Sequence, residues 1–170
     1  MDILKVIQQR ATARSFTGGE ADAQSIERIL EAGRLAPSAK NRQAWRFVAA
    51  VDEDVKKSIA EACYGDKRVE QASCIIAACT TNIQYTMPNG QPSYPLDLAF
   101  AVSYMDLQAV HEGLGSLILG TYNEEAVRNR LSVPYAMRVV LLLAIGPTDD
   151  PQSSYKNRFH RDRVISYNHW

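Results

Sequence analysis

Residues 35–47 read LAPSAKNRQAWRF, and this stretch joins a predicted helix to a predicted strand. The segment before it, Ser25 to Leu35, carries apolar residues at helical spacing, and Trp45 to Val51 is typical of a strand. Pro37 ends the helix because it disfavours the α conformation at Ala36. The polar side chains of the bend suit a plain turn as well as a binding site: they are Ser38, Asn41 and Gln43.

Helices and strands alternate on both sides of this bend. A long apolar helix is expected to be buried on several sides, because its apolar residues surround most of its circumference. A segment with three prolines and a glycine is predicted to be a long loop, and a lid or a simple crossover fits it equally well. Strands are predicted over 44–51, 73–80, 116–120 and 137–146, the last of them central; helices over 2–9, 25–35, 52–65, 96–114 and 123–131; and the long loop over 82–95.

The composition favours a single domain over residues 1–170 with a sizeable core, since 46% of the residues are hydrophobic. Lys plus Arg equals Asp plus Glu at 19 each, so no overall charge recruits nucleic acid or a membrane. The longest apolar run, 139–145, is too short to span a bilayer, and the first residues lack the features of a signal peptide. We therefore expect a soluble, cytoplasmic protein.

Several familiar site types are excluded by spacing. The glycines of 113–120 follow a helix instead of a strand, and no Lys or Ser/Thr follows them where a phosphate-binding loop needs these residues. The three histidines have no ligand spacing, so no metal site is expected. The cysteines form no CxxC motif and are expected to be small buried hydrophobes, with the last two on opposite faces of a strand: they are Cys63, Cys74 and Cys79.

Two segments concentrate cations. Arg10, Thr12 and Arg14 alternate, so in an extended segment they would point one way and could bind a phosphate through charge-assisted hydrogen bonds. A solvated, cation-rich loop is the alternative. Near the other end, a basic tail is typical of solvation or nucleic-acid contact; its cations are Lys156, Arg158, Arg161 and Arg163.

Four motifs follow one another along the chain. They are Arg-x-Thr-x-Arg after an N-terminal helix, Ala-Pro-Ser-x-x-Asn-x-Gln-x-Trp at 36–45, Gly-Leu-Gly after the long apolar helix, and a basic tail that ends in Trp170. This order resembles the FMN-dependent nitroreductase family over nearly the whole chain. Two departures are Thr12, which keeps the hydroxyl of the usual Ser, and Ala44, which replaces the usual Pro.

The resemblance implies an α+β fold with a mostly antiparallel central sheet flanked by helices, in an intertwined homodimer with FMN at the interface. The helix at 96–114 is then the natural core of the dimer. The resemblance also implies that Arg68 lies beside the pyrimidine edge of the flavin, where a cation stabilises the charge left by reduction. The implied cofactor-binding residues are Arg10, Thr12 and Arg14 at the phosphate and ribityl chain; Pro37, Ser38, Asn41 and Gln43 along the flavin, often in the other subunit's site; Arg68; Leu119 and Gly120 at the N5 and O4 side; and Lys156 and Arg158 at the phosphate.

The activity implied by the resemblance is electron transfer from NADH or NADPH, through FMN, to a small electron-poor acceptor such as a nitroaromatic or a quinone. We nominate no catalytic acid or base, because the cofactor carries the chemistry. Two alternatives stay open at this point. One is a non-catalytic flavin- or nucleotide-binding dimer, and the other is a nucleic-acid module built on the basic tail.

Overall fold

The computed structural model describes residues 3–150 and 157–170. The helices and strands predicted from periodicity are confirmed within a few residues, whereas the short helix α4 was not predicted. The loop ends at Ser93 instead of Pro95, because Pro95 lies in the first turn of α5, where proline is tolerated. The elements are α1 (Lys5–Gln9), α2 (Ala23–Arg34), η1 (Ala39–Asn41), β1 (Trp45–Ala50), α3 (Glu53–Ala62), α4 (Lys67–Gln71), β2 (Cys74–Thr80), α5 (Tyr94–His111), β3 (Gly115–Leu119), α6 (Glu124–Arg130), β4 (Arg138–Gly146) and η2 (Arg161–Arg163).

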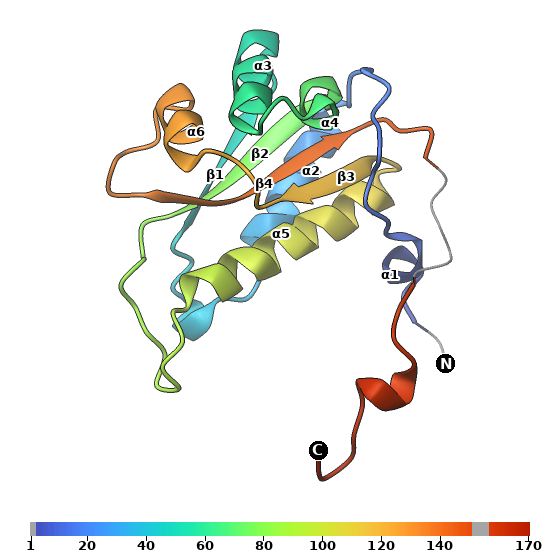
Figure 1. Cartoon of the computed structure of the whole chain (residues 1–170), viewed down its shortest axis with the longest axis vertical. Helices are drawn as coiled ribbons and strands as arrows, with labels where there is room; N and C mark the ends of the chain where they lie inside the picture. The colour runs from blue at the N-terminus through green and yellow to red at the C-terminus, as the bar shows by residue number, and fades with distance from the viewer. Residues whose placement is uncertain (1–2, 151–156) are drawn as a thin grey trace.

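The four strands form one antiparallel sheet in the order β1-β2-β4-β3 (Figure 1). β4 pairs with both β2 and β3, which confirms its predicted central place. β3 forms one edge of the sheet, and its ladder with β4 ends at the pair Leu119↔Leu142. The prediction of a mostly antiparallel sheet flanked by helices is therefore confirmed.

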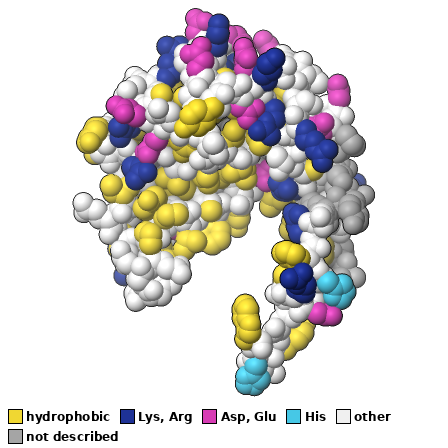
Figure 2. All heavy atoms as spheres, viewed as in Figure 1, with side chains coloured by type: hydrophobic (Ala, Val, Ile, Leu, Met, Phe, Trp, Pro, Cys, Tyr) yellow, Lys and Arg dark blue, Asp and Glu magenta, His cyan; other side chains and the backbone are white. Residues whose placement is uncertain are grey.

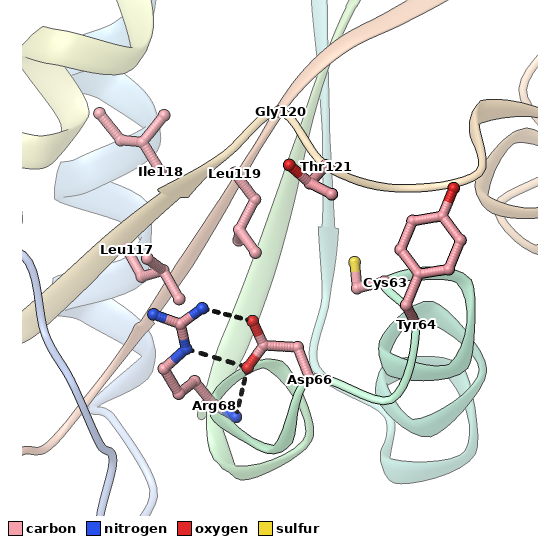
Figure 3. A pocket seen from close by; sticks show the side chains of 9 residues that line it. All are labelled: Cys63, Tyr64, Asp66, Arg68, Leu117, Ile118, Leu119, Gly120 and Thr121. Atoms are coloured by element: carbon pink, nitrogen blue, oxygen red, sulfur yellow. Dashed lines mark hydrogen bonds and ion pairs between the residues drawn. The ribbon is translucent and has the colours of Figure 1, made fainter.

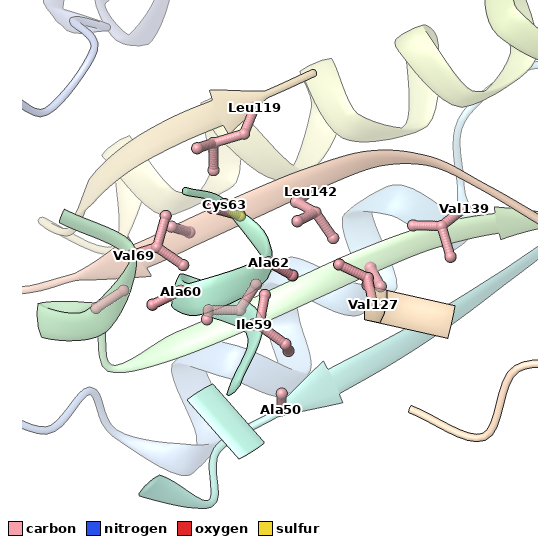
Figure 4. Close-up of a cluster of buried hydrophobic side chains, with 14 of the residues drawn as sticks. Ala50, Ile59, Ala60, Ala62, Cys63, Val69, Leu119, Val127, Val139 and Leu142 are labelled. Carbon is pink, nitrogen blue, oxygen red and sulfur yellow. The ribbon is translucent and has the colours of Figure 1, made fainter. Parts of the chain in front are cut away.

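Helices cover both faces of this sheet. Ile59 of α3, Val69 of α4 and Val127 of α6 pack in a core cluster on one face (Figures 1 and 4). Ile29 of α2 and Met105 of α5 belong to a second cluster on the other face. Alternate residues of β2 enter the two clusters, so every residue of this strand is buried.

The predictions for the cysteines are confirmed, and two of the predicted helices begin at residues whose side chains cap them. The side chain of Asp52 accepts a hydrogen bond from the Val55 N–H at 3.0 Å at the start of α3, and Asn123 caps α6 in the same way. Cys74 and Cys79 are buried in opposite core clusters, and burial raises the pKa of the Cys74 thiol to about 12.

The long helix α5 differs from its prediction, because within one chain it is buried on one face only. Its outer face exposes a stripe of Leu96, Phe100 and Tyr104, at intervals of four residues. The described C-terminal residues 157–170 form an exposed arm that extends away from the body (Figure 1). Among the described residues, no helix combines the length and the apolar character that crossing a membrane requires.

Candidate functional site

A cleft with a volume of about 540 Å³ opens beside the edge strand β3 (Figure 3). One wall is the end of β3 with the two residues that follow it, 117–121, and the other wall is the connection from α3 to α4. The lining residues are Cys63, Tyr64, Asp66, Arg68, Leu117, Ile118, Leu119, Gly120 and Thr121. The structure thus brings together three of the predicted site residues, Arg68, Leu119 and Gly120.

The wall opposite β3 is formed by a sharp turn. The Gly65 N–H donates to the carbonyl of Ala60 at 2.9 Å, which ends α3. Tyr64 and Gly65 then take φ values of 59° and 75°, in the left-handed region that glycine adopts easily and tyrosine rarely does. The turn directs the chain into α4 and places Asp66 and Arg68 in front of β3 (Figure 3).

Arg68 is held at the cleft by Asp66. Its Nε donates to Asp66 Oδ1 at 3.0 Å and its Nη2 donates to Oδ2 at 2.6 Å, and the same Oδ1 accepts the Arg68 backbone N–H at 3.0 Å. This fork-to-fork geometry is the strongest form of an ion pair between side chains. The Arg68 guanidinium holds the pKa of Asp66 below its ordinary value, so the carboxylate is ionised at neutral pH.

Gly120 leaves the end of β3 open. It follows the last residue of the ladder between β3 and β4, and a Cβ added there would meet no atom within 4 Å. The neighbouring Leu119 is buried and packs in the core cluster below the cleft. A flat ligand can therefore approach the backbone of Gly120 without a side chain in its way.

The N-terminal segment runs beside the start of the same strand. Thr12 forms a parallel bridge with Ser116 of β3, and Arg10 Nη1 donates to Thr12 Oγ1 at 3.4 Å. Arg10 also pairs with Asp106 of α5, at 3.5 Å from Nη1 to Oδ2. The predicted pair of Arg10 and Thr12 therefore meets in space, one residue away from the cleft along β3.

Arg14 makes a different contact. Its backbone N–H donates to Asp150 Oδ2 at 2.5 Å, and the next N–H, that of Ser15, donates to the same oxygen at 3.0 Å. The Arg14 side chain is exposed. Its predicted role in binding phosphate stays a prediction.

The bend at 37–43 does not line the cleft; it packs at the start of α5. Asp97, in the first turn of α5, accepts the Ala39 N–H at 2.8 Å, whereas the Arg10 partner Asp106 lies nine residues further along this helix. Gln43 N–H donates to Ser38 Oγ at 3.0 Å, and Lys40, Asn41 and Gln43 have positive φ values between 50° and 54°. One chain does not bring Pro37, Ser38, Asn41 or Gln43 to the cleft that holds Arg68.

Arg158 is not among the residues that line the cleft. Arg158 is exposed on the arm, where its Nη1 donates to the carbonyl of Asn157 at 3.0 Å. Lys156 lies outside the described residues. The predicted contacts of Lys156 and Arg158 with the phosphate stay predictions.

The acidic partners Asp66 and Asp106 were missed from the sequence. A signal for Asp106 exists, because a carboxylate in a helix that is apolar all round must find a cation or donors. Ser116 Oγ donates to Asp106 Oδ1, and Arg10 holds the other oxygen. No comparable signal marks Asp66, which lies in an ordinary polar turn.

Comparison with known proteins places this fold in a family. The model of the nitroreductase family matches residues 7–91 and 63–147. The chain is 30% identical to an Archaeoglobus fulgidus protein provisionally named an NADH dehydrogenase/NAD(P)H nitroreductase, over 96% of both chains. The chain therefore belongs to the nitroreductase family of oxidoreductases.

Solved structures agree with this assignment. A nitroreductase family protein from Clostridium novyi NT superposes with a TM-score of 0.81 at 26% identity, covering 90% of this chain and 89% of that one. An FMN-dependent nitroreductase from Clostridium difficile R20291 gives a TM-score of 0.85 at 21% identity over 99% and 100% of the two chains. The second likeness bears on the fold alone.

Proposed function

We propose that this protein is an FMN-dependent oxidoreductase that passes electrons from NADH or NADPH to a small electron-poor acceptor, such as a nitroaromatic or a quinone. The observation that carries the proposal is the cleft of about 540 Å³, whose lining combines the Arg68 guanidinium with the open backbone at Gly120. The name of the A. fulgidus relative supports the donor.

The residues present fit FMN. The flavin ring needs a flat space with a cation at its pyrimidine edge, and the cleft is lined by the open backbone at Gly120 and by the Arg68 guanidinium. The phosphate needs a guanidinium and a hydroxyl, and Arg10 and Thr12 lie together along the same strand. We assign the binding of the flavin ring to Arg68 and Gly120, and the binding of the phosphate to Arg10 and Thr12.

Bound FMN would supply the two-electron redox chemistry. The residues of the protein would bind the cofactor and orient it. Arg68 stabilises the charge that accumulates at the pyrimidine edge. The Cys63 thiol at the back of the cleft is no nucleophile, because burial raises its pKa to about 11. No acid or base of this chain is assigned to the reaction.

A homodimer would complete the site. The exposed stripe of α5, with Phe100 at its centre, and the apolar side chains of the arm both lack cover in one chain (Figure 2). Burying such surfaces against a second copy is favourable, and it would let the bend at 37–43 and the arm of one subunit reach the cleft of its partner. A dimer would therefore explain why the predicted site residues of the bend and of the arm do not reach the cleft of their own chain.

Two further assignments complete the proposal. We assign residues 1–170 to a single nitroreductase-like domain, because both core clusters pack on the two faces of one sheet. We assign the protein to the cytoplasm, where its three free, buried cysteines suit a reducing compartment.

Anaerobic spectroscopy tests the activity. FMN-loaded protein is mixed with NADH or NADPH, and the flavin absorbance should bleach; a nitroaromatic or a quinone added afterwards should restore it. If neither donor bleaches bound flavin, the protein is a non-catalytic flavin-binding dimer. The relative rates with the two acceptors then identify the acceptor class.

A further inference from the structure

Asp66 sits at the cleft without a role in the proposed reaction. Both of its carboxylate oxygens are occupied by the Arg68 guanidinium, at 3.0 and 2.6 Å, and the pair lies on the cleft wall opposite β3 (Figure 3). Within residues 3–150 and 157–170, no second carboxylate pairs with Arg68. The charge that Arg68 presents to a ligand is therefore set by Asp66.

We infer that Asp66 is a positioning residue that attenuates the charge of Arg68 and thereby lowers the reduction potential of the bound flavin; this inference rests on the proposed function. An isolated guanidinium would act on the cofactor with a full positive charge. A guanidinium paired to a carboxylate at hydrogen-bonding distance acts mainly as a dipole, whose field falls off faster with distance. Asp66 thus sets how strongly the site favours reduced over oxidised flavin.

The carboxylate also fixes where the guanidinium lies. Asp66 is the N-cap of α4, so its own position is set by the backbone, and the two hydrogen bonds restrain the long Arg68 side chain at the cleft. Partial exposure of the Arg68 side chain leaves room for a ligand on its free side. A ligand in the cleft meets a guanidinium that is already ordered.

The substitution Asp66→Asn separates charge from structure. Asn caps helices about as well as Asp and keeps one of the two side-chain acceptors for Arg68, while the negative charge is removed. The sign of the effect follows from Coulomb's law, because removing an anion near a group that gains negative charge on reduction favours the reduced state. The midpoint potential of bound FMN should therefore rise.

The experiment measures the midpoint potential of bound FMN in wild type, Asp66→Asn, Arg68→Ala and the double variant. Asp66→Asn should raise the affinity for reduced relative to oxidised FMN about tenfold, which is about 30 mV for a two-electron couple. Arg68→Ala should lower the potential, and the double variant should lie near wild type, because the two opposite charges of the pair are then removed together. The matched control is Asp52→Asn, which neutralises the N-cap of α3 outside the cleft lining and should leave the potential unchanged.

The outcomes separate this inference from the proposed function. If Asp66→Asn leaves the potential unchanged or lowers it while wild type binds FMN, the inference is overturned and the proposed function stands. A double variant whose potential stays at the Arg68→Ala value shows that the Asp66 charge does not act on the flavin, and it overturns the inference as well. Wild-type protein that binds no FMN overturns both.

Discussion

Arg10 and the buried carboxylate of Asp106 form an ion pair that joins the N-terminal segment to α5, with 3.5 Å between Nη1 and Oδ2. Ser116 Oγ donates to the other oxygen of Asp106, so β3 joins the same cluster. Arg10 therefore has two tasks: it neutralises a buried charge and, in the proposed site, it binds the cofactor phosphate. Substitutions of Arg10 can separate these tasks.

We predict that Arg10→Ala weakens FMN binding at least about tenfold, since hydrogen bonds to charged groups contribute about 1.5–3 kcal/mol each. It should also lower the free energy of unfolding by about 1–3 kcal/mol, because Asp106 loses its cation. Arg10→Lys should restore the stability and leave FMN binding weak, because lysine lacks the planar fork. Flavin fluorescence titration and chemical denaturation measure the two effects, and wild-type FMN affinity in Arg10→Ala would remove Arg10 from the site.

Arg14→Ala should weaken FMN binding without a loss of stability. The contact of Arg14 with Asp150 uses its backbone N–H, which alanine retains, and its side chain is exposed. The expected loss of FMN affinity is again about tenfold, for one charged hydrogen bond. An unchanged dissociation constant at an unchanged melting temperature would show that this side chain is only solvated.

Phe100→Asp should separate the proposed dimer. The Phe100 side chain lies at the centre of the exposed stripe of α5 and is 49% exposed in one chain, so a charge there harms an interface and not the monomer. Sedimentation should show a monomer that holds FMN poorly, whereas the control Val51→Asp, at an exposed site after β1, should remain dimeric. A monomer that is fully loaded with FMN would contradict a site that borrows Ser38 and Asn41 from its partner.

The sequence was sufficient for the sheet and helices because their periods of two and 3.6 residues are visible in single segments. It was insufficient for α4, since Val69 is the one apolar residue of this helix and a single residue shows no period. The pair of Arg10 and Asp106 joins residues 96 positions apart, and no local pattern records such a contact. The exposure of the outer face of α5 in one chain could not be predicted, because apolar residues that face the core and apolar residues that face outward look alike in sequence.

The acid stability of the fold should depend on Glu112. Hydrogen bonds from Arg28, and further ones from Gln108 and Ser25, lower the pKa of Glu112 from 4.5 to about 2. Since its pKa is depressed in the folded state, the stabilisation is complete above the unfolded value and is lost as the pH falls through the folded value.

Wild type should therefore be more stable than Glu112→Gln above about pH 4.5, and the difference should disappear as the pH falls toward about 2. Urea unfolding across this range measures it. Glu31→Gln is the matched control, because it breaks an exposed pair with Arg34 on the surface of α2 and should have little effect at any pH. A difference between wild type and Glu112→Gln that persists unchanged at pH 2 would contradict the assignment.

The absorbance spectrum of the purified protein, recorded before and after addition of FMN and removal of the excess, tests the central claim most directly. The proposed site predicts the absorbance of bound oxidised flavin, either as isolated or after loading, with close to one FMN per chain. A protein that shows no flavin absorbance and retains none after loading would contradict the assignment of the cleft at Arg68 and Gly120 to this cofactor.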